Sequence, residues 1–71
     1  MKHITFTAIF ADGHAQTLGT SVYVDDFPDV ESDATAQARA ILMGHPEYVA
    51  MELAGDAFGF LRVSAKHGEE H

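Results

Sequence analysis

The sequence contains no cysteine, so neither a disulfide nor a thiolate metal site is available to this chain. It also lacks any long apolar run, whereas a membrane-spanning helix needs about 20 consecutive apolar residues. The first residues begin an alternating strand pattern directly, without the charged and apolar regions of a signal peptide. We therefore expect a cytoplasmic protein that does not enter a membrane.

Basic residues are also scarce. Lys2, Arg39, Arg62 and Lys66 face eleven acidic residues, which gives a formal net charge of −7. Binding to nucleic acid requires several phosphates to be neutralised by lysine or arginine. This composition therefore argues against direct nucleic-acid binding and favours a protein partner with a basic surface.

A chain of 71 residues has room for one small domain. At this size folding buries only about 60% of the surface that the unfolded chain exposes, so the core is thin and self-association would supplement it. We expect a single α+β domain over residues 1–66, a frayed polar tail over residues 67–71, and a homodimer.

Apolar residues alternate through residues 4–10, as in a β-strand, and are followed by a turn. A three-residue loop at 11–13, with Gly13 in the left-handed conformation, pairs Phe6 with Leu18. The returning strand is expected at about 16–24, with a possible bulge at Gly19. Its core-facing side chains in this interpretation are Leu18, Val22 and Val24.

Residues 34–43 are mostly strong helix formers, preceded by Ser32 or Asp33 as the expected N-cap. Gly44 is expected as a left-handed C-cap. The inward stripe of this helix is expected to comprise Ala34, Ala38, Ile41 and Leu42.

A second hairpin is expected around Gly55 and Asp56, which pairs Met51 with Phe60 and Leu53 with Phe58. The order of elements is then ββαββ. This order predicts a four-stranded antiparallel sheet with one helix packed on one face, and leaves the strand order open.

Five acidic residues gather between the first hairpin and the helix: Asp25, Asp26, Asp29, Glu31 and Asp33. The favoured explanation of the cluster itself is stabilisation of a helix N-terminus, which attracts negative charge, and docking to a basic partner is the alternative. Their spacing does not match a calcium-binding loop. The five histidines are dispersed, so no metal site is expected.

The sheet face away from the helix is expected to present Ile9, Tyr23, Leu61 and Val63. An apolar patch of this kind favours self-association or capture of a partner.

No nucleophile motif or phosphate-binding loop is present, so we expect neither enzymatic activity nor a cofactor. The favoured hypothesis is a small acidic protein-binding module that inhibits a nucleic-acid-handling protein by occupying its basic surface. Phage-encoded inhibitors of host defence are analogous in size and charge alone. The alternatives are an assembly subunit that oligomerises through its open sheet face, and a small ligand- or metal-binding domain.

Overall fold

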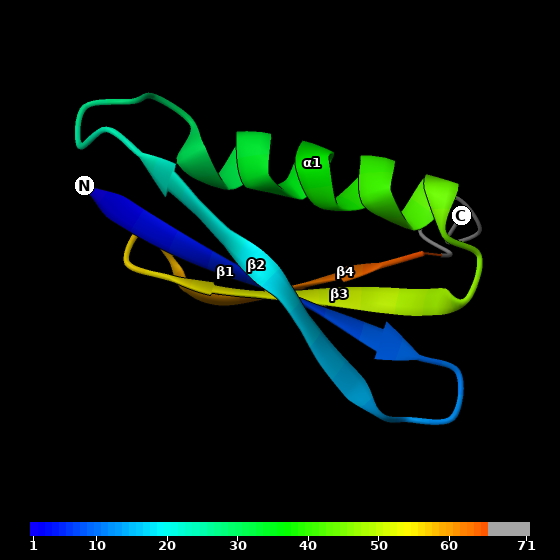
Figure 1. Cartoon of the computed structure of the whole chain (residues 1–71). Coiled ribbons are helices and arrows are strands. Elements are labelled where there is room, and N and C mark those ends of the chain that lie inside the picture. The colour runs from blue at the N-terminus through cyan, green and yellow to red at the C-terminus, as the bar shows by residue number, and fades with distance from the viewer. Residues whose placement is uncertain (66–71) are drawn as a thin grey trace.

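The computed structural model describes residues 1–65, so the expected frayed tail lies outside the described residues. Four strands form one antiparallel sheet in the order β2-β1-β3-β4, and a single helix lies on one side of it (Figure 1). The elements are β1 (Lys2–Phe10), β2 (Ala15–Tyr23), α1 (Val30–Gly44), β3 (Tyr48–Gly55) and β4 (Gly59–Ser64). The predicted ββαββ, α+β fold is confirmed.

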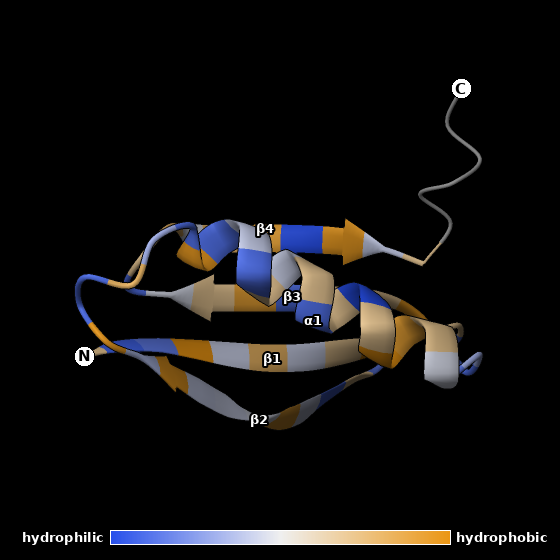
Figure 2. Cartoon of the chain, turned by 90° about the horizontal axis from the view of Figure 1, so that it is seen from above, coloured by the Kyte–Doolittle hydropathy of each residue, from blue (hydrophilic) through white to orange (hydrophobic). Residues whose placement is uncertain are grey.

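The helix packs through a stripe of residues four positions apart. Val30, Ala34, Ala38 and Leu42 are buried, and Ile41 packs against the same core. Ala34 and Ala38 are fully buried, and their small side chains allow the helix backbone to approach the sheet closely. Seen from above, the helix crosses the sheet obliquely and leaves much of β2 uncovered (Figure 2). Among the described residues no helix is long and apolar enough to cross a membrane.

The ends of α1 differ from the expectation. The helix begins at Val30, and its N-cap is Asp29, which adopts the left-handed conformation at φ 56° and makes no side-chain capping hydrogen bond. Burial of Val30 extends the apolar stripe one turn before Ala34, past the expected caps Ser32 and Asp33, which outweighs their capping preference. Gly44 is the last helical residue and its φ is not positive; the C-cap is His45, whose N–H donates to the carbonyl of Leu42 at 3.2 Å.

The first hairpin has the predicted loop, and Gly13 has a positive φ of 97°. Near the turn the register is also the predicted one, since Thr7 pairs with Thr17. A bulge then inserts Leu18, so Phe6 pairs with Gly19 instead. Because side chains alternate between the faces of a sheet, one inserted residue inverts the rest of the strand.

This inversion corrects the predicted faces of β2. Val22 was expected in the core but is 53% exposed, whereas Tyr23 was expected outside but is only 9% exposed. Leu18 and Val24 were also expected in the core, and both are exposed.

The second hairpin has a longer loop than expected. Gly55 pairs with Gly59, whose φ is 79°, and Leu53 pairs with Leu61 instead of Phe58. This register differs from the predicted one by three residues, an odd number that exchanges the faces of β4.

The expected outward positions of Leu61 and Val63 are therefore wrong. Val63 belongs to the core and Leu61 packs against it, while Phe60, which was expected inside, is 62% exposed on the other face.

The face turned away from the helix is called the open face below. It presents the odd-numbered residues of β1 from 3 to 9 and the even-numbered residues of β3 and β4 from 50 to 54 and from 60 to 64. Thr20 and Val22 extend it onto β2. Ile9 lies on this face, as predicted, where it pairs with Ala50.

Candidate functional site

The five acids of residues 25–33, called the acidic segment below, connect β2 to the first turn of α1. All five side chains belong to exposed residues. Glu31 and Asp33 lie in the first helical turn, where the helix dipole favours negative charge, as the sequence indicated. The structure nevertheless separates the five acids by what each one contacts.

Asp25 is paired within the chain. Its Oδ1 lies 2.7 Å from the N-terminal ammonium of Met1, and its carbonyl accepts a hydrogen bond from Lys2 Nζ. The hydrogen bond from this ammonium, reinforced by its charge, lowers the pKa of the Asp25 carboxyl. Asp25 therefore joins the segment to the start of β1.

Asp33 is also occupied. Its Oδ2 accepts a hydrogen bond of 2.8 Å from the hydroxyl of Tyr23. Burial of Tyr23, together with this bond to a carboxylate, raises the pKa of the Tyr23 phenol to about 12. The Tyr23 ring also packs against Phe27, with centroids 5.2 Å apart. This contact fixes the loop between β2 and α1, so Tyr23 has a structural role and is not exposed for partner binding.

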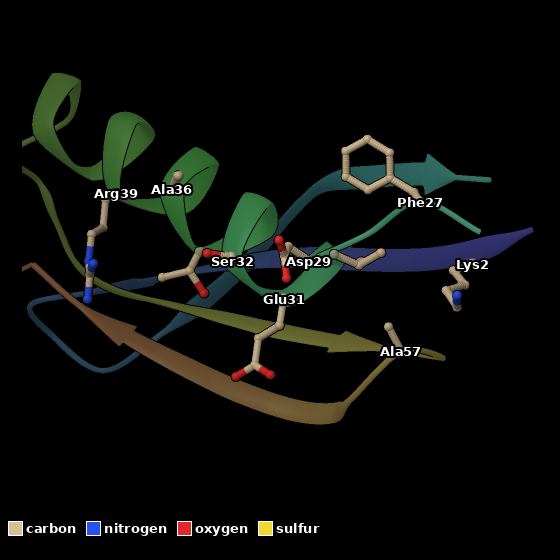
Figure 3. A pocket seen from close by; sticks show the side chains of 10 residues that line it. Lys2, Phe27, Asp29, Glu31, Ser32, Ala36, Arg39 and Ala57 are labelled. Carbon is tan, nitrogen blue, oxygen red and sulfur yellow. The ribbon is translucent and has the colours of Figure 1, made fainter. Parts of the chain in front are cut away.

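The other three acids, Asp26, Asp29 and Glu31, have no ion pair within the part of the chain that the structure describes. Asp29 and Glu31 line an open groove of about 750 Å³ between the helix and the turn at Ala57 (Figure 3). These three carboxylates are the part of the acidic segment that remains available to a partner.

The groove also contains two cations that the sequence interpretation did not assign to a site. Lys2 and Arg39 line it together with the acids (Figure 3). Arg39 follows Glu31 by eight residues on the helix, and Thr35 lies between them, so helical spacing alone places all three on one face. Lys2 reaches the groove only through tertiary structure, which the sequence pattern does not show.

Metal binding finds no support in residues 1–65. No three histidine, aspartate or glutamate side chains in this range come together as a metal site. Asp12 and Glu47 each face a histidine instead, at 2.5 Å from His14 and 3.3 Å from His45. Hydrogen bonds from the backbone N–H and ring of His14 lower the pKa of Asp12.

Four rings connect one end of the fold. His14 stacks on Phe10 with centroids 4.1 Å apart, Phe10 meets Tyr48 edge-on at 5.1 Å, and Tyr48 stacks on His45 at 5.0 Å. These contacts join the first turn, β1, β3 and the end of α1. The two histidines therefore have a packing role, which accounts for them without a ligand.

Two surfaces of residues 1–65 thus remain without an explanation from folding alone. They are the three free acids, of which Asp29 and Glu31 line the groove, and the open face of the sheet. The chain matches no known protein-family model, no curated protein and no solved structure.

Proposed function

We propose that this chain is a non-enzymatic binding module that docks on a basic surface of another protein through Asp26, Asp29 and Glu31. The observation that supports this proposal is that these exposed carboxylates have no cationic partner among residues 1–65. Asp29 makes no capping hydrogen bond, so its carboxylate is not needed to begin the helix.

The chemistry of the partner follows from charge. A net charge of −7 attracts basic surfaces and accelerates encounter at low salt. Proteins that handle nucleic acids carry such surfaces in order to neutralise phosphates. The exposed carboxylates of Asp26, Asp29 and Glu31 offer an alternative set of negative charges, so the module would act as an inhibitor by occupying the site. The analogy with phage-encoded inhibitors rests on size and charge alone, and the expected compartment is the cytoplasm.

Lys2 and Arg39 restrict which partner fits. Both line the groove beside Asp29 and Glu31, so the surface alternates in sign instead of being uniformly acidic. A partner with lysine or arginine opposite the acids and a neutral or acidic group opposite Arg39 is favoured. Partners with a different arrangement of charges are disfavoured, because they would place like charges opposite each other.

The test neutralises the three free acids together. The variant Asp26→Asn, Asp29→Asn, Glu31→Gln should fold normally, because none of these side chains makes an ion pair among the described residues and asparagine tolerates the left-handed position of Asp29. Affinity capture from a cytosolic extract is compared at about 50 mM and about 300 mM salt. A specific partner should bind the wild type at low salt and be lost both from the variant and at high salt.

The matched control changes charge by the same amount elsewhere. Asp12→Asn, Glu47→Gln, Asp56→Asn also moves the net charge from −7 to −4, that is −7 + 3. These residues lie in the two hairpin turns and in the loop between α1 and β3. A partner lost equally from both variants would show that net charge, and not the acidic segment, is responsible.

Two alternatives stay as predictions. An assembly subunit would form larger closed oligomers, which sedimentation at several concentrations detects. A small ligand- or metal-binding domain would release heat on titration with zinc or calcium, beyond the heat of dilution.

A further inference from the structure

We infer that the open face is the contact surface of a homodimer, in which two copies stack face to face through their sheets. The occupant is thus a second copy of this chain, and the acidic segment of each copy stays outside the contact.

The first reason is the distribution of charge. The only acid and the only arginine or lysine on the open face, as far as the structure describes it, are Glu52 and Arg62, which pair at 3.6 Å. The remaining positions are chiefly threonine, alanine, valine, isoleucine and phenylalanine. Two copies of charge −7 repel each other through most of their surfaces. The open face is the broad surface on which this repulsion is smallest.

The ion pair also suits a two-fold contact. In a symmetric dimer the same patch meets itself, so Glu52 of one copy can face Arg62 of the other, and the reverse pair forms at the same time. The Glu52–Arg62 pair is neutral within one copy, and each of its two charges can also face the opposite charge on the other copy. No other cation is required to cover the acid.

The second reason is the shape of the open face, which has both protruding and recessed side chains. Phe60 is 62% exposed and Val22 is 53% exposed, so two large side chains protrude. Phe60 is paired across the strands with Ala54, and Ala50 lies further along β3 at 4% exposure. Protruding side chains beside the small side chains of alanine allow the side chains of two stacked sheets to interdigitate.

The third reason is size, which also sets the expected strength. Four strands about 4.8 Å apart, each about seven residues long at roughly 3.3 Å per residue, cover a footprint of roughly 400 Å², to which every second residue contributes its side chain. Side-chain relief increases the accessible area towards the roughly 800 Å² per partner that stable interfaces bury. We therefore expect a reversible dimer with a Kd of about 10–100 μM.

A second copy would also compensate for the small core of a single copy. The largest fully buried side chains among residues 1–65 are Ile4, Met51 and Leu53, all on the helix side of the sheet. Residues 1–65 cover one side of the sheet, with α1, and leave the other side without a second layer (Figure 1). A second sheet supplies the missing layer, which is what small domains require.

Sedimentation equilibrium from about 1 μM to about 1 mM tests the inference. The wild type should change from 7.7 kDa towards twice that mass as concentration rises. Phe60→Lys should weaken the dimer at least about tenfold. Met43→Lys introduces the same charge at a residue that is 82% exposed on the helix, and should leave the dimer unchanged. Ala54→Glu serves as a second variant on the open face and should also weaken the dimer.

Salt separates this inference from the proposed function. Dimer formation should strengthen at least about twofold between about 20 mM and 300 mM salt, because screening reduces the repulsion between like-charged copies. Binding to a basic partner should weaken over the same range. A protein that stays monomeric up to about 1 mM would overturn the dimer and leave the role of the acidic segment untouched.

A different dimer would also overturn the inference. If two copies paired through the free edge of β2, concentration-dependent NMR shifts would be confined to the amides of β2, and Phe60→Lys would have no effect. Face-to-face stacking should instead shift Ile9, Ala54 and Phe60 together.

Discussion

Gly55→Ala is the substitution for which the structure gives the sharpest expectation. Gly55 ends β3 and lies opposite Ile4 in β1. A Cβ atom added at Gly55 would lie 2.8 Å from the carbonyl oxygen of His3, and it would also collide with the Cδ1 atom of Ile4. The Cδ1 atom is the end of a side chain, although a fully buried one, whereas the His3 carbonyl belongs to the backbone of a paired strand and cannot move independently.

The size of the effect follows from this difference. Overpacking that forces backbone to move costs about 1–3 kcal/mol. In a domain of this size each kcal/mol lowers Tm by about 4–8 °C. We therefore expect Gly55→Ala to lower Tm by roughly 4–24 °C, and the free energy of unfolding in urea to fall by about 1–3 kcal/mol.

Gly19→Ala is the matched control, because it makes the same chemical change in another strand. An added Cβ there meets no atom of residues 1–65 within 4 Å. Glycine within a strand is costly, so alanine at this position should be neutral or stabilising by about 0.5–1 kcal/mol. Thermal and urea unfolding followed by circular dichroism measure both variants. The reasoning is refuted if Gly55→Ala unfolds within about 2 °C of the wild type, or if both variants lose the same stability.

Three further expectations concern the contacts of Tyr23 and the faces of β4. Tyr23→Phe keeps the packed ring but removes the 2.8 Å hydrogen bond to Asp33, so the free energy of unfolding in urea should fall by about 0.5–1.5 kcal/mol. An unchanged free energy would mean that water replaces the bond fully. The pKa of Tyr23 is about 12 in the folded protein and about 10 when unfolded, so its neutral form stabilises the fold fully below pH 10, and this contribution is lost as the pH rises from 10 to 12. Absorbance titration in a Tyr48→Phe background should give a phenolate midpoint near 12, and a midpoint near 10 would contradict the burial of the hydroxyl. Val63→Ala should lower the free energy of unfolding by about 1–2.5 kcal/mol, because Val63 is 4% exposed. Phe60→Ala, measured at low micromolar protein, should lower it by less than about 0.5 kcal/mol. The reverse ranking would contradict the observed register of β4.

The strands and the helix were predictable because their signals are local. Alternation in residues 4–10, the alanine-rich stretch before Gly44 and the glycines of the two turns each indicate one element. The inward stripe of the helix could also be predicted, since its period is set by the helix itself. These signals suffice for the ββαββ order.

The register of β4 could not be predicted in the same way. One register would bury Phe58 and Phe60 together, and the other would bury Leu61 and Val63. The hydrophobic pattern therefore fits two registers equally. The choice is made by the length of the turn, through the positive φ of Gly59. A two-residue turn satisfies the same pattern and gives the opposite faces.

The acidic segment shows a similar limit. Its position before the helix could be read from the sequence, but the division between engaged and free acids could not. Asp33 is engaged because Tyr23 faces the helix, and Tyr23 faces the helix because of the bulge at Leu18. The hydrogen bond between Tyr23 and Asp33, which are ten residues apart, therefore depends on a bulge that comes before both of them in the chain.

The inserted residue at Leu18 has a consequence for how this protein can change over time. Deleting one residue between Thr17 and Thr20 would straighten the strand and exchange the roles of Val22 and Tyr23 in a single step. The phenol would then point to water, and the loop that it tethers would lose its anchor. The number of residues in β2 is therefore constrained more strictly than their identity, and homologous chains should tolerate substitution in this strand far more readily than a change of length.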